Sequence, residues 1–306
     1  MTTPSAAVAE REKVYLGGFP IGISIDVGGL LVESVSGVET EYGTAEVEGL
    51  CRGDIIKAIN GTAVSTVDEM QSLLTDAPTE IVLIRGGETV KTEVRPIVEV
   101  YSDKPKLGVK VKEKLYGIGT VSFVDLDRDY AALGHEIYDS ETGTHIPFTS
   151  GKIHGCKVLG VKRGEKGEAG AILASLDPDA VYGTVVCNNN FGIAGKFTAD
   201  FELGPPIEVA HRSEVKPGRA QIRTAVDGTP QFYDIEIIKA VRQTGRREKG
   251  IIFRVTDKRL LDMTGGVVRG MSGSPIIQDG KLAGSVTHVI LNDFTKGYGV
   301  YADCLN

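Results

Sequence analysis

The sequence predicts a mainly β protein of two domains, and three observations support this. The chain has 306 residues, about the length of two ordinary domains. Its 39 glycines and 12 prolines provide many turns, and short apolar stretches with strand periodicity recur between them. Helical periodicity is scarce. These features favour antiparallel strands, with a closed or double β-barrel over the longer C-terminal part.

The first domain is expected over residues 14–98, after an N-terminal tail of residues 1–13. The stretch Gly49–Gly61 reads GLCRGDIIKAING, which is a half-buried strand that ends in an Asn-Gly turn. This stretch resembles the L-x-x-G-D-x-I-x-x-I-N-G sequence of PDZ domains. A helix is expected at 66–74, where Thr66 caps the first turn and Glu69 completes a capping box.

The resemblance to PDZ domains implies that an extended peptide or a C-terminus binds as an added strand. In such domains, amides of a glycine-containing loop hold the terminal carboxylate. Pro20–Ser24 is the candidate loop, with Ile21, Gly22 and Ile23 as its binding residues, and the groove is expected beside the 66–74 helix. The alternative is a module that only positions the second domain.

A linker is expected at 99–106 and a second domain at 107–306, where strand signals dominate. The expected strands of this domain are Leu107–Val111, Gly119–Val124, Lys157–Val161, Ala171–Leu173, Thr184–Cys187, Ile207–Ala210, Gln221–Thr224, Phe232–Ile238, Ile251–Val255, Ser274–Ile277 and Leu282–Val289.

The sequence Gly270-Met271-Ser272-Gly273-Ser274-Pro275 is the strongest chemical signal in the chain. A serine between glycines, followed by proline and a strand, resembles the nucleophile turn of chymotrypsin-like peptidases. In that geometry Ser272 attacks, and the N–H groups of Gly270 and Ser272 form the oxyanion hole. The alternative is a glycine-rich turn without catalytic function. An α/β-hydrolase elbow is excluded by chain order, because His288 is the only histidine after Ser272.

A general base must therefore lie upstream, and His135 is the favoured one of the five histidines. It follows Ala131-Ala132-Leu133-Gly134, a small and apolar approach that can bury one side of an imidazole. The remaining histidines are His145, His154, His211 and His288.

Several motifs together resemble the stage IV sporulation protein B peptidases, which are chymotrypsin-like serine endopeptidases with a PDZ domain ahead of the peptidase domain. The motifs are Gly117-Ile118-Gly119-Thr120, Ala132-Leu133-Gly134-His135, Thr256-Asp257, Gly265-Gly266 and Gly270–Pro275. The resemblance covers nearly the whole chain. It implies a chymotrypsin-like double β-barrel in the second domain.

The resemblance also implies that His135 is the general base, Ser272 the nucleophile and Asp257 the residue that orients the imidazole. Asp257 lies close before Ser272, whereas in trypsin-like enzymes the acid lies nearer the histidine in sequence. That general spacing favours Asp177. The family motif favours Asp257, which we follow, and Asp177 is the alternative.

The family's function implies a signalling protease of sporulation. Its expected substrate is a regulator of a membrane-embedded processing protease, and self-cleavage occurs among relatives. The expected location is the space between the forespore and mother-cell membranes. The alternative is a catalytically inactive, PDZ-containing peptide-binding scaffold; the presence of His135, Asp257 and Ser272 favours the peptidase.

Composition limits the other function classes. A net charge of −7 without a basic block argues against nucleic acid as a partner. No apolar stretch approaches the length of a membrane span, and the polar opening of the chain predicts neither a signal nor an anchor. Cys51, Cys156, Cys187 and Cys304 lack metal-ligand spacing, so we expect no zinc and no cofactor. We expect the cysteines to be free thiols, and a Cys156–Cys187 disulfide is the alternative.

Overall fold

The computed structural model of the chain describes residues 12–165, 167–200 and 202–305. Most of the predicted tail 1–13 lies outside this range. Contacts divide the described chain into two compact units. The small unit holds Ser24–Tyr116 and Ile137–Gly151, and the barrel unit holds the residues up to Ile23, Gly117–Glu136 and the residues from Lys152. No helix of the described residues is long and apolar enough to cross a membrane.

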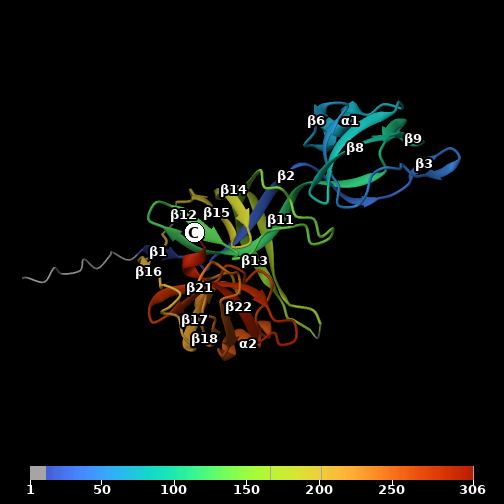
Figure 1. The fold of residues 1–306 in the computed structure, drawn as a ribbon. Helices are drawn as coiled ribbons and strands as arrows, with labels where there is room; N and C mark the ends of the chain where they lie inside the picture. Colours follow the sequence, from blue (N-terminus) through green and yellow to red (C-terminus); the bar gives the residue numbers. More distant parts are fainter. Residues whose placement is uncertain (1–11, 166, 201, 306) are drawn as a thin grey trace, which may run out of the picture. The chain divides into compact units, whose positions relative to one another are not determined.

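The small unit is a strand layer with one helix (Figure 1). Strands β2, β5, β7 and β8 are neighbours in one sheet, and β6 pairs with β5. Its elements are β2 (Pro20–Val35, from Ser24), β3 (Val38–Thr40), β4 (Gly43–Ala45), β5 (Ile55–Ile59), β6 (Thr62–Ala63), α1 (Val67–Leu73), β7 (Thr79–Arg85), β8 (Glu88–Val94), β9 (Ile97–Glu99), β10 (Lys104–Lys106) and the start of β11 (Val109–Asp125).

The local prediction for α1 is confirmed by its cap. The Thr66 side chain accepts a hydrogen bond from the Glu69 N–H at 3.2 Å, and the Glu69 carboxylate accepts from the Thr66 N–H at 3.1 Å. The apolar face of α1 covers the sheet through Met70 and Leu74, which are buried in the small unit's core. The reciprocal bonds satisfy N–H groups that a helix start leaves without partners.

The barrel unit contains a closed barrel of six strands in the order β17-β18-β19-β22-β21-β20. These strands are β17 (Gly218–Thr224), β18 (Gln231–Ala240), β19 (Ile251–Val255), β20 (Pro275–Gln278), β21 (Lys281–Val289) and β22 (Lys296–Tyr301), and α2 (Lys258–Thr264) precedes β20. In β17 and β18 buried and exposed residues alternate, whereas β21 is buried along most of its length, and the buried set fills the barrel.

The rest of the barrel unit is a sheet in the order β16-β1-β11-β12-β15-β14-β13. Its strands are β1 (Lys13–Leu16), the later part of β11, β12 (Asp129–Ala132), β13 (Ser150–Lys162, from Lys152), β14 (Ala171–Asn189), β15 (Gly192–Phe197) and β16 (Ile207–Glu208), and a 3-10 helix, η1 (Ala302–Cys304), follows β22. The predicted mainly β class is thus confirmed. The two strands expected at 171–173 and 184–187 form the single strand β14.

The contacts differ from the linear domain division in two places. Residues 99–106, expected to be a linker, belong to a β-hairpin in which β9 and β10 pair. The left-handed conformation of Asp103, with φ of 52°, allows the turn. Second, the segment 137–151 belongs to the small unit although it follows the strands of the second domain.

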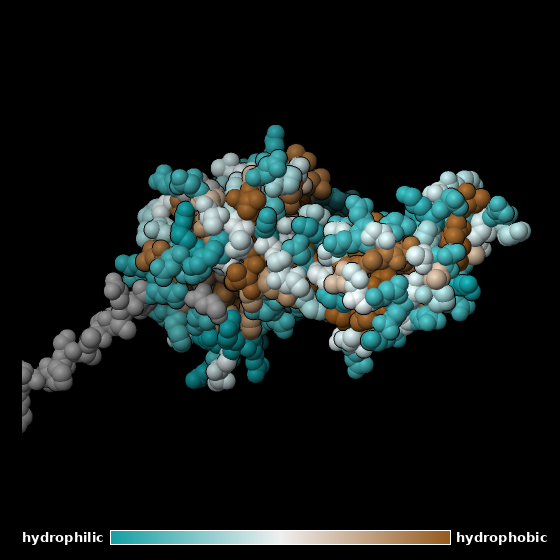
Figure 2. Space-filling model, turned by 90° about the horizontal axis from the view of Figure 1, so that it is seen from above, coloured by the Kyte–Doolittle hydropathy of each residue, from teal (hydrophilic) through white to brown (hydrophobic). Residues whose placement is uncertain are grey.

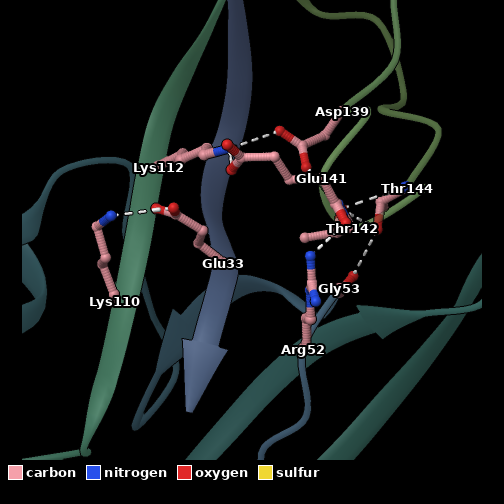
Figure 3. A network of polar contacts seen from close by, with 9 residues as sticks. All are labelled: Glu33, Arg52, Gly53, Lys110, Lys112, Asp139, Glu141, Thr142 and Thr144. Carbon is pink, nitrogen blue, oxygen red and sulfur yellow. Dashed lines mark hydrogen bonds and ion pairs between the residues drawn. The ribbon is translucent and has the colours of Figure 1, made fainter. Parts of the chain in front are cut away.

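Polar contacts explain the placement of this segment (Figure 3). Lys112 on β11 forms ion pairs with Asp139, at 2.8 Å, and with Glu141. Arg52 donates to the Glu141 carbonyl. The pKa of Asp139 lies below its usual value, because the hydrogen bonds from Lys112 and from Thr142 outweigh the opposing effect of burial. The segment directly after His135 and Glu136 is therefore anchored within the small unit.

Candidate active site

The Ser272 turn joins α2 to β20, and its glycines are required by the backbone. Gly270 and Gly273 have φ values of 96° and 98°, in the left-handed region that favours glycine. A Cβ atom on Gly273 would lie 1.8 Å from the Thr120 carbonyl oxygen. The glycines on either side of Ser272 thus permit a tight turn against β11.

Backbone hydrogen bonds hold this turn from two sides. The Thr120 N–H donates to the Ser272 carbonyl at 2.9 Å, and its hydroxyl donates to the Gly270 carbonyl at 2.8 Å. From the barrel, the Gly273 N–H donates to the Val286 carbonyl at 2.8 Å. The position of Ser272 is therefore fixed between β11 and β21.

The N–H groups of Gly270 and Ser272, expected in the oxyanion hole, donate to no acceptor among the described residues. Both residues are partly exposed. Unpaired N–H groups beside a nucleophile are the donors that a developing oxyanion needs.

The Ser272 hydroxyl donates to the Thr287 carbonyl on β21 at 2.7 Å. No hydrogen bond joins Ser272 to His135 in the described part of the chain. In this structure the Ser272 hydroxyl is therefore held by a backbone carbonyl.

His135 reaches the same strand through an unusual turn after β12. Leu133 and Gly134 have φ values of 70° and 72°. A Cβ atom on Gly134 would lie 2.8 Å from the Thr287 side chain, so the turn packs directly on β21. The small residues before His135 thus place the imidazole on the strand that holds the Ser272 hydroxyl.

One hydrogen bond fixes the tautomer of the His135 imidazole. Its Nδ1 lies 2.9 Å from the Glu136 carbonyl oxygen, which can only accept a hydrogen bond. The proton then sits on Nδ1, and the Nε2 lone pair is left to act as a base. Burial lowers the pKa of His135, and the bond to Glu136 opposes part of that effect. The imidazole is therefore neutral at pH 7.

Sequence reasoning missed the proximity of His288 to His135. Their ring centroids are 5.0 Å apart, with planes inclined by 40°. Desolvation, together with the nearby His135 and Lys249, lowers the pKa of His288 to about 4. No local sequence signal indicates this pairing, because it depends on the turn at Gly134 and on the position of β21.

The two candidate acids lie elsewhere. Asp257 caps α2: its carboxylate accepts from the Arg259 N–H at 2.9 Å and from the Arg259 guanidinium at 2.8 Å. It also accepts from the Asp234 N–H at 3.3 Å. Hydrogen bonding from Arg259 is the main cause of its lowered pKa. Asp177 is exposed on β14 and accepts from the Asp179 N–H. Within the described chain, neither carboxylate is hydrogen-bonded to His135.

The expected peptide-binding loop at Ile21, Gly22 and Ile23 is corrected by the structure. These residues lie within strand β2, the side chains of Ile21 and Ile23 are buried, and all three belong to the barrel unit. Leu176 packs against the Gly22 backbone, since a Cβ atom there would lie 2.5 Å from its side chain. The alternating apolar residues of this segment favour a buried strand over a binding loop.

All four cysteines are free thiols, and only Cys304 is fully buried. Burial raises the pKa of the Cys156 thiol to about 11, so it is not a thiolate near neutral pH. No group of three or more potential metal ligands occurs in the described residues.

Comparisons with known proteins add the following findings. The model of the SpoIVB peptidase S55 family matches residues 103–305, and the PDZ domain model matches residues 11–83. No curated protein matches the chain. The active form of Rv3671c protease from M. tuberculosis is 17% identical over 62% of this chain and 70% of its own, with a TM-score of 0.34. The inactive form of Rv3671c protease is 16% identical over 61% of this chain and 80% of its own, with a TM-score of 0.32.

Proposed function

Because the chain belongs to the SpoIVB peptidase S55 family, and is thus a serine endopeptidase, we propose that Ser272 and His135 carry out its reaction. The observation that supports this most directly is that both residues lie against β21. The Ser272 hydroxyl bonds the Thr287 carbonyl, and the turn before His135 packs on the Thr287 side chain.

In the proposed reaction the Ser272 hydroxyl leaves the Thr287 carbonyl and turns to the Nε2 atom of His135. As Oγ attacks the carbonyl carbon of the scissile peptide, His135 takes its proton. The N–H groups of Gly270 and Ser272 stabilise the oxyanion. His135 then protonates the leaving amine, and a water molecule, deprotonated by the same imidazole, hydrolyses the acyl-enzyme.

The third member of the proposed site is the residue that orients His135. The family resemblance assigns the orienting role to Asp257, whereas Nδ1 of His135 donates to the backbone carbonyl of its neighbour Glu136. We propose that this carbonyl holds the imidazole in the described arrangement. For Asp257 to orient His135, its carboxylate would have to break its hydrogen bonds with Arg259.

The finer biological role rests on the family name and on the resemblance described above. We propose a sporulation signalling protease that is exported to the space between the forespore and mother-cell membranes. Its proposed substrate is a membrane-associated regulator of a processing protease, and a second proposed target is the chain itself.

Labelling with a fluorophosphonate tests the catalytic proposal. The parent is expected to be labelled, and labelling should vanish in Ser272→Ala and fall at least a hundredfold in rate in His135→Ala. Ser274→Ala is the matched control, because it removes a hydroxyl two residues away, and it should be labelled like the parent. Labelling that persists in Ser272→Ala would refute the assignment. A folded parent without any labelling would instead favour the peptide-binding scaffold.

A further inference from the structure

The surface of the barrel unit suits small, water-borne ligands better than a broad apolar partner. In the part of Figure 2 where Figure 1 places β1 and β16, hydrophilic side chains predominate and apolar ones lie in separate patches. Among small ligands, transition-metal ions are those that neighbouring histidines bind. His135 and His288 are such neighbours, and both belong to the barrel unit.

A β-bulge directs His288 out of the barrel. On β21 the register against β22 shifts between Val286 and His288, so that β21 has one residue more than its partner at this point. Bulges of this kind change the direction of side chains and are frequent beside active sites. Thr287 is buried and His288 is exposed. The bulge thus leaves the His288 imidazole outside the core, beside the ring of His135.

The separation of the two rings suits a shared metal ion. Their centroids are 5.0 Å apart, and their planes are inclined by 40°. Two imidazoles that bind one tetrahedral zinc ion through nitrogen atoms at about 2.0 Å have ring centroids about 5 Å apart. The centroids of His135 and His288 therefore already have the spacing of two ligands on one ion.

Each imidazole has a nitrogen atom that can bind a metal. Nδ1 of His135 donates to the Glu136 carbonyl at 2.9 Å, and Nε2, which carries the lone pair, has no hydrogen-bond partner among the described residues. Metal-binding histidines commonly donate their other ring N–H to a carbonyl or carboxylate in this way. The His288 side chain forms no hydrogen bond within the part of the chain that the structure describes. Water and ions can reach both rings, because His135 is half-buried and His288 is exposed.

The ligand set determines the class of ion and the strength of binding. Imidazole suits zinc, copper and nickel ions, whereas magnesium and calcium ions prefer oxygen ligands. The described residues contain no group of three potential ligands, so water must complete the coordination. Lys249 lies on the ring of Tyr298, which is opposite His288 in the strand register, and its charge opposes a cation. With two protein ligands and a nearby ammonium group, the site should bind its ion reversibly.

We propose that Nε2 of His135 and the imidazole of His288 bind one divalent transition-metal ion, and that the bound ion silences the peptidase. The ion occupies the lone pair that would take the proton of Ser272, so the general base is lost while the ion is bound. Only the two coordination bonds form, and removal of the ion restores the base. The silencing rests on the proposed role of His135 in catalysis, whereas the binding does not.

Binding is tested on the full chain carrying Ser272→Ala, because this measurement needs no peptidase activity. The metal-free protein competes with a chromogenic chelator for Zn²⁺ at pH 7. We expect one bound ion per chain, and His288→Gln should weaken binding about tenfold or more. His211→Gln is the matched control, because it removes another exposed imidazole, and it should bind zinc like its parent. Lys249→Gln should bind zinc more tightly. Circular dichroism verifies that each variant is folded.

Silencing is tested by fluorophosphonate labelling of the chain with Ser272 intact. Saturating Zn²⁺ should lower the labelling rate about tenfold or more, and a chelator should restore it. The zinc concentration that halves the rate should rise about tenfold or more in His288→Gln, each variant being compared with its own metal-free rate. In His211→Gln this concentration should stay that of the parent.

Two results would overturn the metal site: a folded Ser272→Ala chain that binds no zinc, and equal zinc affinity with and without His288→Gln. Zinc that binds through His288 but leaves labelling unchanged would overturn the silencing. A metal-free parent that is never labelled, yet binds zinc through His288, would refute the catalytic proposal and support the metal site. The failure of one proposal is therefore distinguishable from the failure of the other.

Discussion

Replacing Asp257 by asparagine separates a structural role of this residue from a catalytic one. Asparagine keeps the oxygen that caps α2, since Asn and Asp are equivalent N-caps. It loses the charge that pairs with Arg259; the Arg259 side chain is 62% exposed and the Asp257 side chain is 8% exposed. Because the guanidinium end of the pair is solvated, we take its contribution as about 1 kcal/mol, the upper end of the range for exposed pairs. We therefore expect Asp257→Asn to lower the free energy of unfolding by about 1 kcal/mol or less and kcat/KM by less than tenfold.

An orienting acid would give a very different result. Loss of the carboxylate that orients a catalytic histidine costs about 10⁴ in kcat, or about 5.4 kcal/mol in activation free energy. The assay combines urea unfolding with the rates of peptide hydrolysis and of fluorophosphonate labelling. Asp177→Asn tests the other candidate acid, and Asp257→Ala, which also removes the cap, should cost about 1 kcal/mol more in stability.

A loss near 10⁴ in Asp257→Asn, with stability almost unchanged, would refute this reasoning. It would mean that the carboxylate leaves Arg259 and reaches His135 during catalysis.

Four further predictions concern pH dependence and packing. The rate of fluorophosphonate labelling should decrease as the pH falls through the lowered pKa of His135, because only the neutral imidazole is a base. The midpoint should lie below 6.5, and labelling rates measured between pH 4 and 8 test this. His288 has a pKa of about 4 in the folded chain, so between pH 6.5 and 4 this histidine is neutral when folded but protonated when unfolded. The free energy of unfolding should therefore fall as the pH decreases from 6.5 toward 4. Urea unfolding of His288→Gln should show a flatter dependence on pH. Gly273→Ala should abolish labelling and reduce expression of folded protein, whereas Gly245→Ala, whose Cβ would meet no atom within 4 Å, should do neither. Thr66→Ala should lower the stability of the small unit by about 1 kcal/mol, measured by hydrogen exchange in α1.

The fold was predictable where the signal is local. The cap of α1 depends on two residues three positions apart, Thr66 and Glu69, and both contacts are present. Strands β17 and β18 follow from alternation within each strand. The division into units was not predictable in this way, because β2 and β11 each contribute residues to both units. Which part of a long strand joins which core depends on contacts between distant segments.

The candidate site also has one part that local sequence predicts and another that it does not. The turn at Ser272 is recognisable because Gly270 and Gly273 are demanded by positive φ and by close backbone packing. The acceptors for the serine hydroxyl and for the imidazole are the carbonyls of Thr287 and Glu136. Backbone carbonyls occur at every residue, so no sequence pattern could single these two out.

The hydrogen bond from Ser272 to the Thr287 carbonyl does not by itself imply an inactive enzyme. A hydrogen bond of this kind contributes about 1 kcal/mol net, so breaking it would lower the reaction rate about fivefold. Turning the hydroxyl to His135 replaces that bond with another, so even this cost is largely recovered. Absent labelling in a folded parent would therefore have to come from a misplaced imidazole or a closed substrate path. The Ser272 turn is held by β11 and β21, whereas the segment directly after His135 and Glu136 is anchored within the small unit.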